Sequence, residues 1–193
     1  MKQAACPVWR YIMNLTKFTQ KSMEAVNGCE KLAAEYGHQH LMEEHLLHCL
    51  LSDNEGILPK LFEKMEIDTK VFLAQVDGIL SKFPKVQGGR SYVGEELNKA
   101  LIYAENEAKA MGDDYVSVEH LFLSVLKYPS RDLKGLFEDF RITRDSFLKA
   151  LATIRGNQRV TTDNPEATYD TLAKYGTDLV ERAKRGKLEP VIG

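Results

Sequence analysis

The sequence has few of the features that mark secreted, membrane-bound or nucleic-acid-binding proteins. Its three cysteines are an odd number without any Cys-x-x-Cys spacing, which favours reduced thiols over a disulfide framework. No apolar run approaches the length that a bilayer span needs. The net charge is −2, with basic side chains scattered among acids, so nothing attracts nucleic acid or an anionic membrane. We therefore expect a cytoplasmic protein with neither nucleic acid nor a membrane as a partner.

Motifs for common enzyme chemistries are also missing. The sequence has no Gly-x-Ser-x-Gly, no cysteine–histidine signature and no Gly-x-x-x-x-Gly-Lys-Ser/Thr phosphate loop. An acidic residue in the first turn of a helix, such as Glu44 or Glu119, is favoured by the helix dipole without any catalytic role. We therefore expect no enzyme that is complete within these 193 residues.

The strongest positive feature is a tandem duplication. The segment Glu44-His45-Leu46 returns 75 positions later as Glu119-His120-Leu121. The same ungapped register matches Leu51 with Leu126, Leu58 with Leu133, Leu61-Phe62-Glu63 with Leu136-Phe137-Glu138, Ile67 with Ile142, and Phe72-Leu73 with Phe147-Leu148. So long a match at one offset indicates two copies of one structural unit.

A histidine cluster in the first copy favours a competing hypothesis. His38, His40, His45 and His48 could hold a metal, although the His-Glu-x-x-His spacing of zinc proteases is absent. Only His45 recurs in the second copy, as His120, so the duplicated Glu-His pair is typical of a packed helix. We expect no metal site, and a small metalloenzyme remains the alternative that metal analysis would test.

Capping residues and apolar spacing predict four helices in each copy. Thr19 can cap a helix that runs to about Tyr36 and ends at Gly37. Further helices are expected over about 42–51, 59–65 and 68–80, and the second copy repeats this order with Gly112, Ser117 and Thr143 at its caps. No stretch alternates with period two, so no sheet is expected.

These patterns predict an all-α fold of two tandem four-helix repeats, eight helices in a pseudo-twofold arrangement. One repeat of about 65 residues would bury too little apolar surface to be secure alone. Two repeats packed together leave a shared seam, and a groove of that kind suits extended or partly unfolded polypeptide. Binding is therefore the function that the sequence favours.

Changes in composition divide the chain. We expect residues 1–12 to be a disordered or non-native extension and not an ordered arm. Repeat one is expected over 13–83 and repeat two over 91–156, together one domain over 13–156. The polar stretch 157–171 is expected to be a flexible linker. Residues 172–193 predict one further helix, at the start of another domain.

Particular residues resemble the Clp family. The duplicated Glu-His-Leu helix looks like the Clp N-terminal repeat. The join Phe83-Pro84-Lys85-Val86-Gln87-Gly88-Gly89 is similar to that of ClpB-type chaperones. The tail Ala183-Lys184-Arg185-Gly186-Lys187-Leu188-Glu189-Pro190 resembles the entry to their first AAA+ module. The resemblance covers about Met13 to Gly193.

The resemblance implies the substrate-recognition domain of an ATP-dependent disaggregase, which takes unfolded or aggregated polypeptide and passes it to a hexameric AAA+ ring. That family works with the DnaK system through a middle domain. Three positions match its substrate-binding surface, Thr19, Asp113 and Glu119. Pro190, Val191, Ile192 and Gly193 match the segment that packs against adenine.

The parent protein would require ATP and Mg²⁺. We expect no cofactor, no nucleotide hydrolysis and a monomeric state for these 193 residues. The alternative is an adaptor-docking N-terminal domain of a protease-linked Clp ATPase, whose partner would be a folded adaptor.

Overall fold

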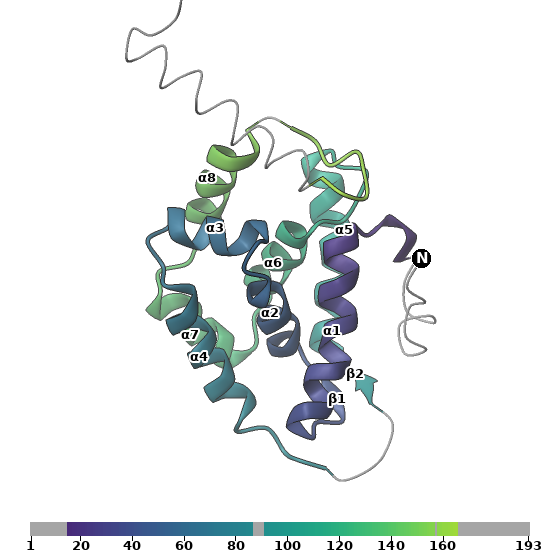
Figure 1. Ribbon diagram of the computed structural model, residues 1–193, viewed down its shortest axis with the longest axis vertical. Helices are drawn as coiled ribbons and strands as arrows, with labels where there is room; N and C mark the ends of the chain where they lie inside the picture. Colours follow the sequence, from purple (N-terminus) through teal and green to yellow (C-terminus); the bar gives the residue numbers. More distant parts are fainter. Residues whose placement is uncertain (1–14, 87–90, 157, 166–193) are drawn as a thin grey trace, which may run out of the picture.

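The computed structural model describes residues 15–86, 91–156 and 158–165, and these residues form an α-helical domain (Figure 1). The first repeat holds a 3-10 turn, η2, and four helices: η2 Leu15–Lys17, α1 Gln20–Tyr36, α2 Glu43–Ser52, α3 Ile57–Lys64 and α4 Thr69–Leu80. The second repeat holds four more: α5 Glu95–Met111, α6 Val118–Lys127, α7 Arg131–Asp139 and α8 Arg144–Arg155. The predicted all-α class and its eight helices are confirmed. None of the described helices is long and apolar enough to cross a membrane.

The helices begin and end where the capping residues predict. The Thr19 hydroxyl accepts a hydrogen bond from the Ser22 amide at the start of α1, and the Asp68 carboxylate accepts from the first amides of α4. Gly37 and Gly112 end α1 and α5 in the left-handed conformation, with φ of 76° and 72°. A side chain would be strained at either glycine.

The duplication is reproduced in three dimensions. The bounds of α5, α6 and α8 are those of α1, α2 and α4 moved by the 75-residue offset, and α7 begins one residue earlier than the offset of α3 predicts. In Figure 1 α2 and α6 occupy the middle, α1 and α5 flank them on one side, and α3, α4, α7 and α8 lie on the other.

A very small sheet joins the repeats, where the sequence predicted none. β1, His40–Leu41, pairs in parallel with β2, Tyr92–Val93, and Phe18 forms a bridge with Val116. Strands of two residues are too short to show an alternating pattern, which explains the incorrect expectation. The pairs Leu41–Val93 and Phe18–Val116 are equivalent under the duplication, with the two repeats exchanged. This exchange is the local signature of the pseudo-twofold arrangement.

One core serves both repeats. The ring of Phe62 in α3 lies edge-on to Phe122 in α6, 5.7 Å between centroids, and Phe72 in α4 stacks on Phe137 in α7. Leu46 of α2 and Leu121 of α6 are fully buried in the same core. Since aromatic rings contribute the largest areas to a core, each repeat depends on the other for its apolar contacts.

Candidate functional site

The duplicated histidines have a structural role at the start of α2 and α6. The Nδ1 of His45 accepts a hydrogen bond from the Met42 amide at 3.0 Å, and the Nδ1 of His120 accepts from the Ser117 amide at 2.9 Å. These amides precede the first turn of each helix and have no partner within the helix. The histidines therefore act as helix caps, as the repetition of the Glu-His pair indicated.

The other nitrogen of each histidine distinguishes the two repeats. Because Nδ1 accepts an amide hydrogen, Nε2 carries the ring proton and is a donor. His120 Nε2 donates to Asp113 Oδ2 at 2.9 Å, whereas His45 Nε2 donates to His38 Nδ1 at 2.9 Å. Asp113 and His38 are equivalent under the duplication. Repeat two thus carries a carboxylate at a position where repeat one is uncharged.

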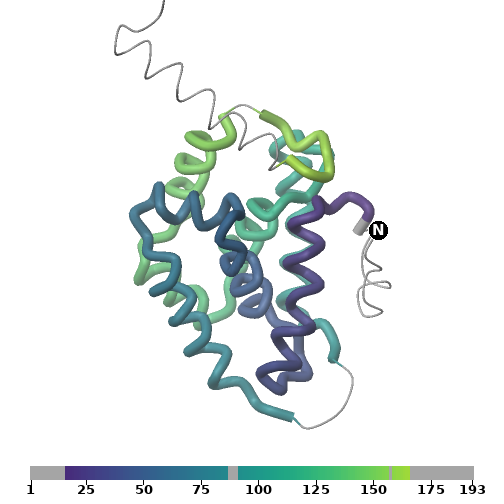
Figure 2. The backbone as a smooth tube through the Cα atoms, viewed as in Figure 1, coloured from purple at the N-terminus to yellow at the C-terminus, as the bar shows by residue number. Residues whose placement is uncertain are grey.

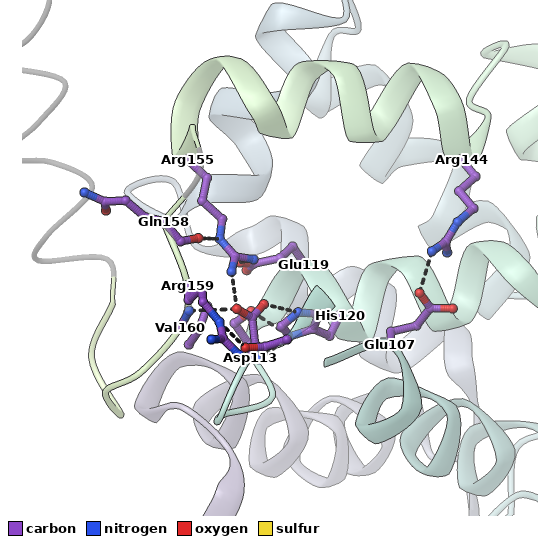
Figure 3. Close-up of polar contacts among 11 residues, drawn as sticks. Glu107, Asp113, Glu119, His120, Arg144, Arg155, Gln158, Arg159 and Val160 are labelled. Atoms are coloured by element: carbon purple, nitrogen blue, oxygen red, sulfur yellow. Dashed lines mark hydrogen bonds and ion pairs between the residues drawn. The ribbon is translucent and has the colours of Figure 1, made fainter. Parts of the chain in front are cut away.

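An arginine at the end of α8 completes a buried cluster around Asp113. Arg155 forms an ion pair with Asp113 and lies 3.5 Å from Glu119, and all three side chains are almost completely buried (Figure 3). Burial alone would raise the pKa of Asp113, but hydrogen bonds from His120 and Arg155 outweigh it and hold that pKa at about 2. At the other end of α8, Arg144 bonds Glu107 of α5 at 2.6 Å. Ion pairs at both ends thus fix α8 to the rest of the second repeat.

Residues 158–165 form a segment without helix or strand, with bends at residues 162 and 163, that covers this cluster and is called the strap below. The carbonyl oxygen of Val160 accepts from the amides of Asp114 and Tyr115, at 2.9 and 3.3 Å, and the Val160 amide donates to Asp113 Oδ1 at 2.8 Å. The Val160 side chain is fully buried. Figure 2 shows the strap in yellow-green beside the beginning of α1, where the Gln20 amide donates to the Asp163 carbonyl at 2.8 Å.

The structure brings the three predicted site residues to one corner. Thr19 lies beside the strap, and its amide donates to the Val116 carbonyl at 2.9 Å. Asp113 and Glu119 meet at Arg155. All three are buried, Thr19 and Glu119 completely. Their proposed role in binding substrate stays a prediction. The adenine-packing residues predicted at 190–193 lie outside the described residues, as do residues 1–14 and 166–189.

The strap occupies residues that the sequence placed in a flexible linker. Residues 158–165 follow α8 directly and make backbone hydrogen bonds to both repeats. The remainder of the predicted linker, 166–171, lies outside the described residues. Composition alone could not predict this placement, because much of the strap's contact uses backbone hydrogen bonds, which any residue can make.

Two buried glutamates join the repeats at a second place. Glu43 accepts from the Ser130 amide, and Glu44 Oε1 accepts from the Ser130 hydroxyl at 2.6 Å, so α2 of repeat one caps α7 of repeat two. Burial raises the pKa of Glu43 to about 8, although the Ser130 bond opposes it. Burial also raises the pKa of Glu44. These carboxyls stabilise the interface best when protonated.

The clustered histidines of repeat one have separate partners. His38 bonds His45, the His40 ring bonds the Tyr92 hydroxyl, and His48 Nε2 lies 3.1 Å from Asp77 Oδ1. Within the described ranges, no group of three or more histidine, cysteine or acidic side chains could hold a metal ion. The four histidines therefore do not share one site. His38 and His45 bond each other, and His40 and His48 each have a different partner.

Several residues of the corner were not predicted from the sequence. Of these residues, Arg155 was the easiest to predict from the sequence, because it follows Leu151 by four positions and so falls on the buried face of α8. A charge on an apolar face indicates a buried partner. Val160 carried no such signal, since a lone valine in a polar stretch is ordinary.

The duplicated eight-helix domain, with reciprocal strand pairs and a capped Glu-His helix in each half, defines a protein of the Clp N-terminal class. The chain belongs to the family described as the Clp repeat (R) N-terminal domain, which matches residues 17–140. It is 41% identical over 186 residues to the chaperone protein ClpB of Bacillus anthracis, and 40% identical over 187 residues to that of Nitratidesulfovibrio vulgaris. Each match covers 94% of this chain, which spans 21% and 22% of the length of these relatives.

Solved structures show the same fold. The N-terminal domain of Hsp104 from Candida albicans superposes with a TM-score of 0.68 at 20% identity, covering 76% of this chain and 97% of that one. The N-domain of ClpV in complex with a VipB peptide has a TM-score of 0.61 at 22% identity, covering 76% and 92%. The chain thus corresponds to the N-terminal domain of ClpB-type chaperones.

Proposed function

We propose that this domain recognises substrate for a ClpB-type disaggregase by binding extended stretches of unfolded or aggregated polypeptide. One observation carries the proposal. A segment without helix or strand, the strap, already lies across the corner of Thr19, Asp113 and Glu119 through backbone hydrogen bonds. Backbone recognition is largely independent of sequence, as a partner for many unfolded chains requires.

The chemistry of the corner fits such a ligand. The amides of Asp114, Tyr115 and Gln20 offer donors to a chain that has no secondary structure of its own. Asp113 Oδ1 accepts one amide of that chain, and one apolar side chain is buried where Val160 lies. A single apolar residue in an extended stretch meets these requirements, and such stretches become exposed when proteins unfold.

The three predicted residues would act mainly by holding this surface in shape. Thr19 caps α1 and so fixes the direction of the Gln20 amide. Asp113 contacts the bound chain directly, and Glu119 holds Arg155 against Asp113. The proposal therefore assigns contact to Asp113 and positioning to Thr19 and Glu119.

The relatives support a role for this domain within a larger protein. Their name, chaperone protein ClpB, fits a domain that delivers polypeptide to a larger machine. In the whole protein we propose a hexameric AAA+ ring that uses ATP and Mg²⁺ in the cytoplasm and works with the DnaK system. Pro190 to Gly193 would contribute to its adenine pocket. The domain itself would be a monomer without a cofactor.

A protease-linked Clp ATPase with a folded adaptor as partner is the alternative. The two functions differ in their ligand, because an adaptor binds through a folded surface and an aggregate through exposed segments. The 41% identity to a ClpB chaperone supports the first.

Fluorescence anisotropy with labelled casein, a natively unfolded polypeptide, tests the proposal. The 193-residue chain should bind it with a Kd in the micromolar range or weaker, because a single small corner buries limited area. No binding at low salt would overturn the proposal. Equal binding of a folded, unrelated protein would show that the surface does not select unfolded chains.

A pair of variants locates the site. Val160→Asp should release the strap and raise the affinity for casein several-fold, since the substrate no longer competes with the strap. Thr161→Asp adds the same charge at an exposed neighbouring position and should leave the affinity unchanged. Equal effects of the two variants would place the binding surface elsewhere. Circular dichroism confirms that both variants are folded.

A further inference from the structure

The strap contacts the rest of the domain through two kinds of group. Its backbone bonds at Val160 are open to any residue with an amide hydrogen, as the proposed function requires. Its side chains are more selective. Val160 and Pro165 are buried, and the side chains of Arg159 and Asp163 each form a hydrogen bond at the end of a helix. These side chains can distinguish one segment from another where the backbone bonds do not.

Arg159 lies at the C-terminal end of α5. Its Nε donates to the carbonyl oxygen of Gly112, the residue that ends the helix. A Cβ on Gly112 would lie 2.9 Å from the guanidinium, so this close approach depends on the glycine. The last carbonyls of a helix lack partners within it and carry a partial negative charge, which favours a cation nearby. This end of α5 therefore favours a basic residue in the strap over an acidic one.

Asp163 lies at the opposite kind of helix end, the start of α1. Its carbonyl oxygen accepts from the Gln20 amide at 2.8 Å, and its Oδ2 accepts from Gln20 Nε2 at 3.3 Å. Gln20 is the first residue of α1, and the first turn of α1 contains no acidic residue, whereas α5 begins with Glu95 and Glu96. The carboxylate of the strap therefore complements the partial positive charge at this end of α1.

The charges beneath the strap favour the same order. The carboxylates of Asp113 and Glu119 both face the guanidinium of Arg155, so these three groups together carry one negative charge in excess. Figure 3 shows Arg159 of the strap beside Asp113. The guanidinium of Arg159 thus offsets the excess at the end of the strap that lies nearer α5, and an acid at its position would add to it.

Repeat one has a basic residue at the equivalent helix end. The segment after α4 lies against the end of α1, where the Val86 amide donates to the Gly37 carbonyl at 2.8 Å. The side chain nearest to a Cβ on Gly37 is that of Lys85, at 3.7 Å. A basic residue thus lies beside the left-handed glycine in both repeats, although the two segments differ in sequence. This recurrence supports a preference that belongs to the helix end.

We propose that the corner selects polypeptide segments by a fixed order of charges: a basic residue, directly followed by a branched apolar residue, with an acidic residue three positions further on. The inference rests on the proposed function, in which the substrate takes the place of the strap. The basic residue lies at the end of α5, the apolar side chain fills the site of Val160, and the acid lies at the start of α1. Because the two helix ends carry opposite partial charges, they also fix the direction in which the segment binds.

Two labelled peptides of identical composition test the order of charges. One has the sequence of residues 158–165, and the other has its arginine and its aspartate exchanged. Fluorescence anisotropy measures both peptides against the 193-residue chain with Val160→Asp, in which the strap should be released. The first peptide should bind about tenfold more tightly, because the exchanged peptide presents each helix end with the charge that it disfavours. Equal affinities would overturn the inference.

Labelled casein, measured on the same Val160→Asp protein, separates this inference from the proposed function. If casein binds and the two peptides do not differ, the order of charges is wrong and the proposed function stands. If casein does not bind, the proposed function fails, and the inference that rests on it fails as well.

A measurement within the chain does not require release of the strap. Exchanging the two charges in place, with Arg159→Asp and Asp163→Arg, should loosen the strap. Hydrogen exchange of the Asp114 amide, which donates to the Val160 carbonyl at 2.9 Å, should then accelerate about tenfold. Thr161→Asp with Thr162→Arg adds one charge of each sign at exposed positions and should leave this exchange unchanged. Equal exchange rates in the two double variants would likewise overturn the inference.

Discussion

His120 donates from Nε2 to the Asp113 carboxylate at 2.9 Å, whereas its counterpart His45 donates over the same distance to a second histidine, His38. The duplication has kept the helix cap and changed its partner. The pair in repeat two is tied to Arg155 and to the strap, whereas the pair in repeat one has no ion pair among the described residues and packs against Phe83 of the segment after α4. Both halves should therefore lose stability in acid, but in different ranges of pH.

Replacing His38, the hydrogen-bond partner of His45, with aspartate should change how His45 responds to acid. Burial, and then the nearby His38, lower the pKa of His45 to about 4, so its neutral form is favoured in the folded state. The stability that it contributes is complete above pH 6.5 and is lost as the pH falls through about 4, at most about 3 kcal/mol. In His38→Asp the new carboxylate should raise this pKa and remove most of the loss.

Urea unfolding between pH 4.5 and 7 measures this effect, and His40→Asp is the matched control. The control adds the same charge at an exposed histidine nearby. Glu43 titrates in the same range in both variants, so the difference between them reports on the His38–His45 pair. Identical pH profiles for the two variants would contradict the assignment.

Asp113→Asn should destabilise the domain by about 3 kcal/mol. The substitution leaves Arg155 buried beside an uncharged amide, and a buried charge without its counter-charge is costly. Asp114→Asn is the control, since Asp114 is the exposed neighbour. Urea denaturation at pH 7 measures both. Equal stability of the two variants would show that the ion pair contributes nothing.

The same carboxylate predicts a further loss of stability in strong acid. The pKa of Asp113 is lowered to about 2 in the folded state, so its contribution is present above about pH 4 and is lost as the pH falls towards 2. Asp113→Asn should therefore unfold with a flatter pH dependence in that range than the unsubstituted chain. A parallel dependence would contradict this prediction.

Glu43→Gln should stabilise the domain at alkaline pH. Burial raises the pKa of Glu43 to about 8, so its contribution to stability is complete below about pH 4.5 and falls as the pH rises through 8. Glutamine keeps the oxygen that accepts from the Ser130 amide and cannot ionise. We expect a gain of about 1–3 kcal/mol at pH 8.5, and little change from the exposed control Glu63→Gln. A loss of stability at pH 8.5 would contradict it.

Two glycines offer a test of the strap. Gly112→Ala and Gly37→Ala each place a side chain at positive φ and should cost about 1–2 kcal/mol. At Gly112 the new Cβ would also lie 2.9 Å from the Arg159 guanidinium, whereas at Gly37 the nearest atom is 3.7 Å away. Gly112→Ala should therefore also loosen the strap. Hydrogen exchange of the Asp114 and Tyr115 amides should accelerate in that variant alone, and equal exchange in both would contradict the prediction.

The helices could be predicted from the sequence because local signals specify them. Thr19, Gly37 and Asp68 act on amides or carbonyls within one turn, so their effect does not depend on the rest of the fold. The apolar residues at helical spacing are an equally local signal, and the duplication shows each of these patterns twice in the sequence. The structure confirms these elements, with α3 beginning two residues earlier than expected.

The corner could be predicted only in part, because its contacts join residues far apart in the chain. Asp113 meets Arg155 across 42 positions, and Val160 meets Asp113 across 47. Much of the strap's contact uses backbone groups that every residue possesses, so its sequence gives little indication of its position. The resemblance to Clp repeats selected Thr19, Asp113 and Glu119, but composition could not show that a segment of the same chain covers them.

In the reciprocal pairing of Phe18 with Val116 and of Leu41 with Val93, the backbone of each repeat orders a segment of the other. The residues that lead into the first helix of one half are aligned by the loop that follows the first helix of the other. Neither half can therefore align the residues before its own first helix without the other half. A chain cut between residues 86 and 91 would therefore yield two fragments that fold only when they associate with each other, and neither fragment would fold in isolation.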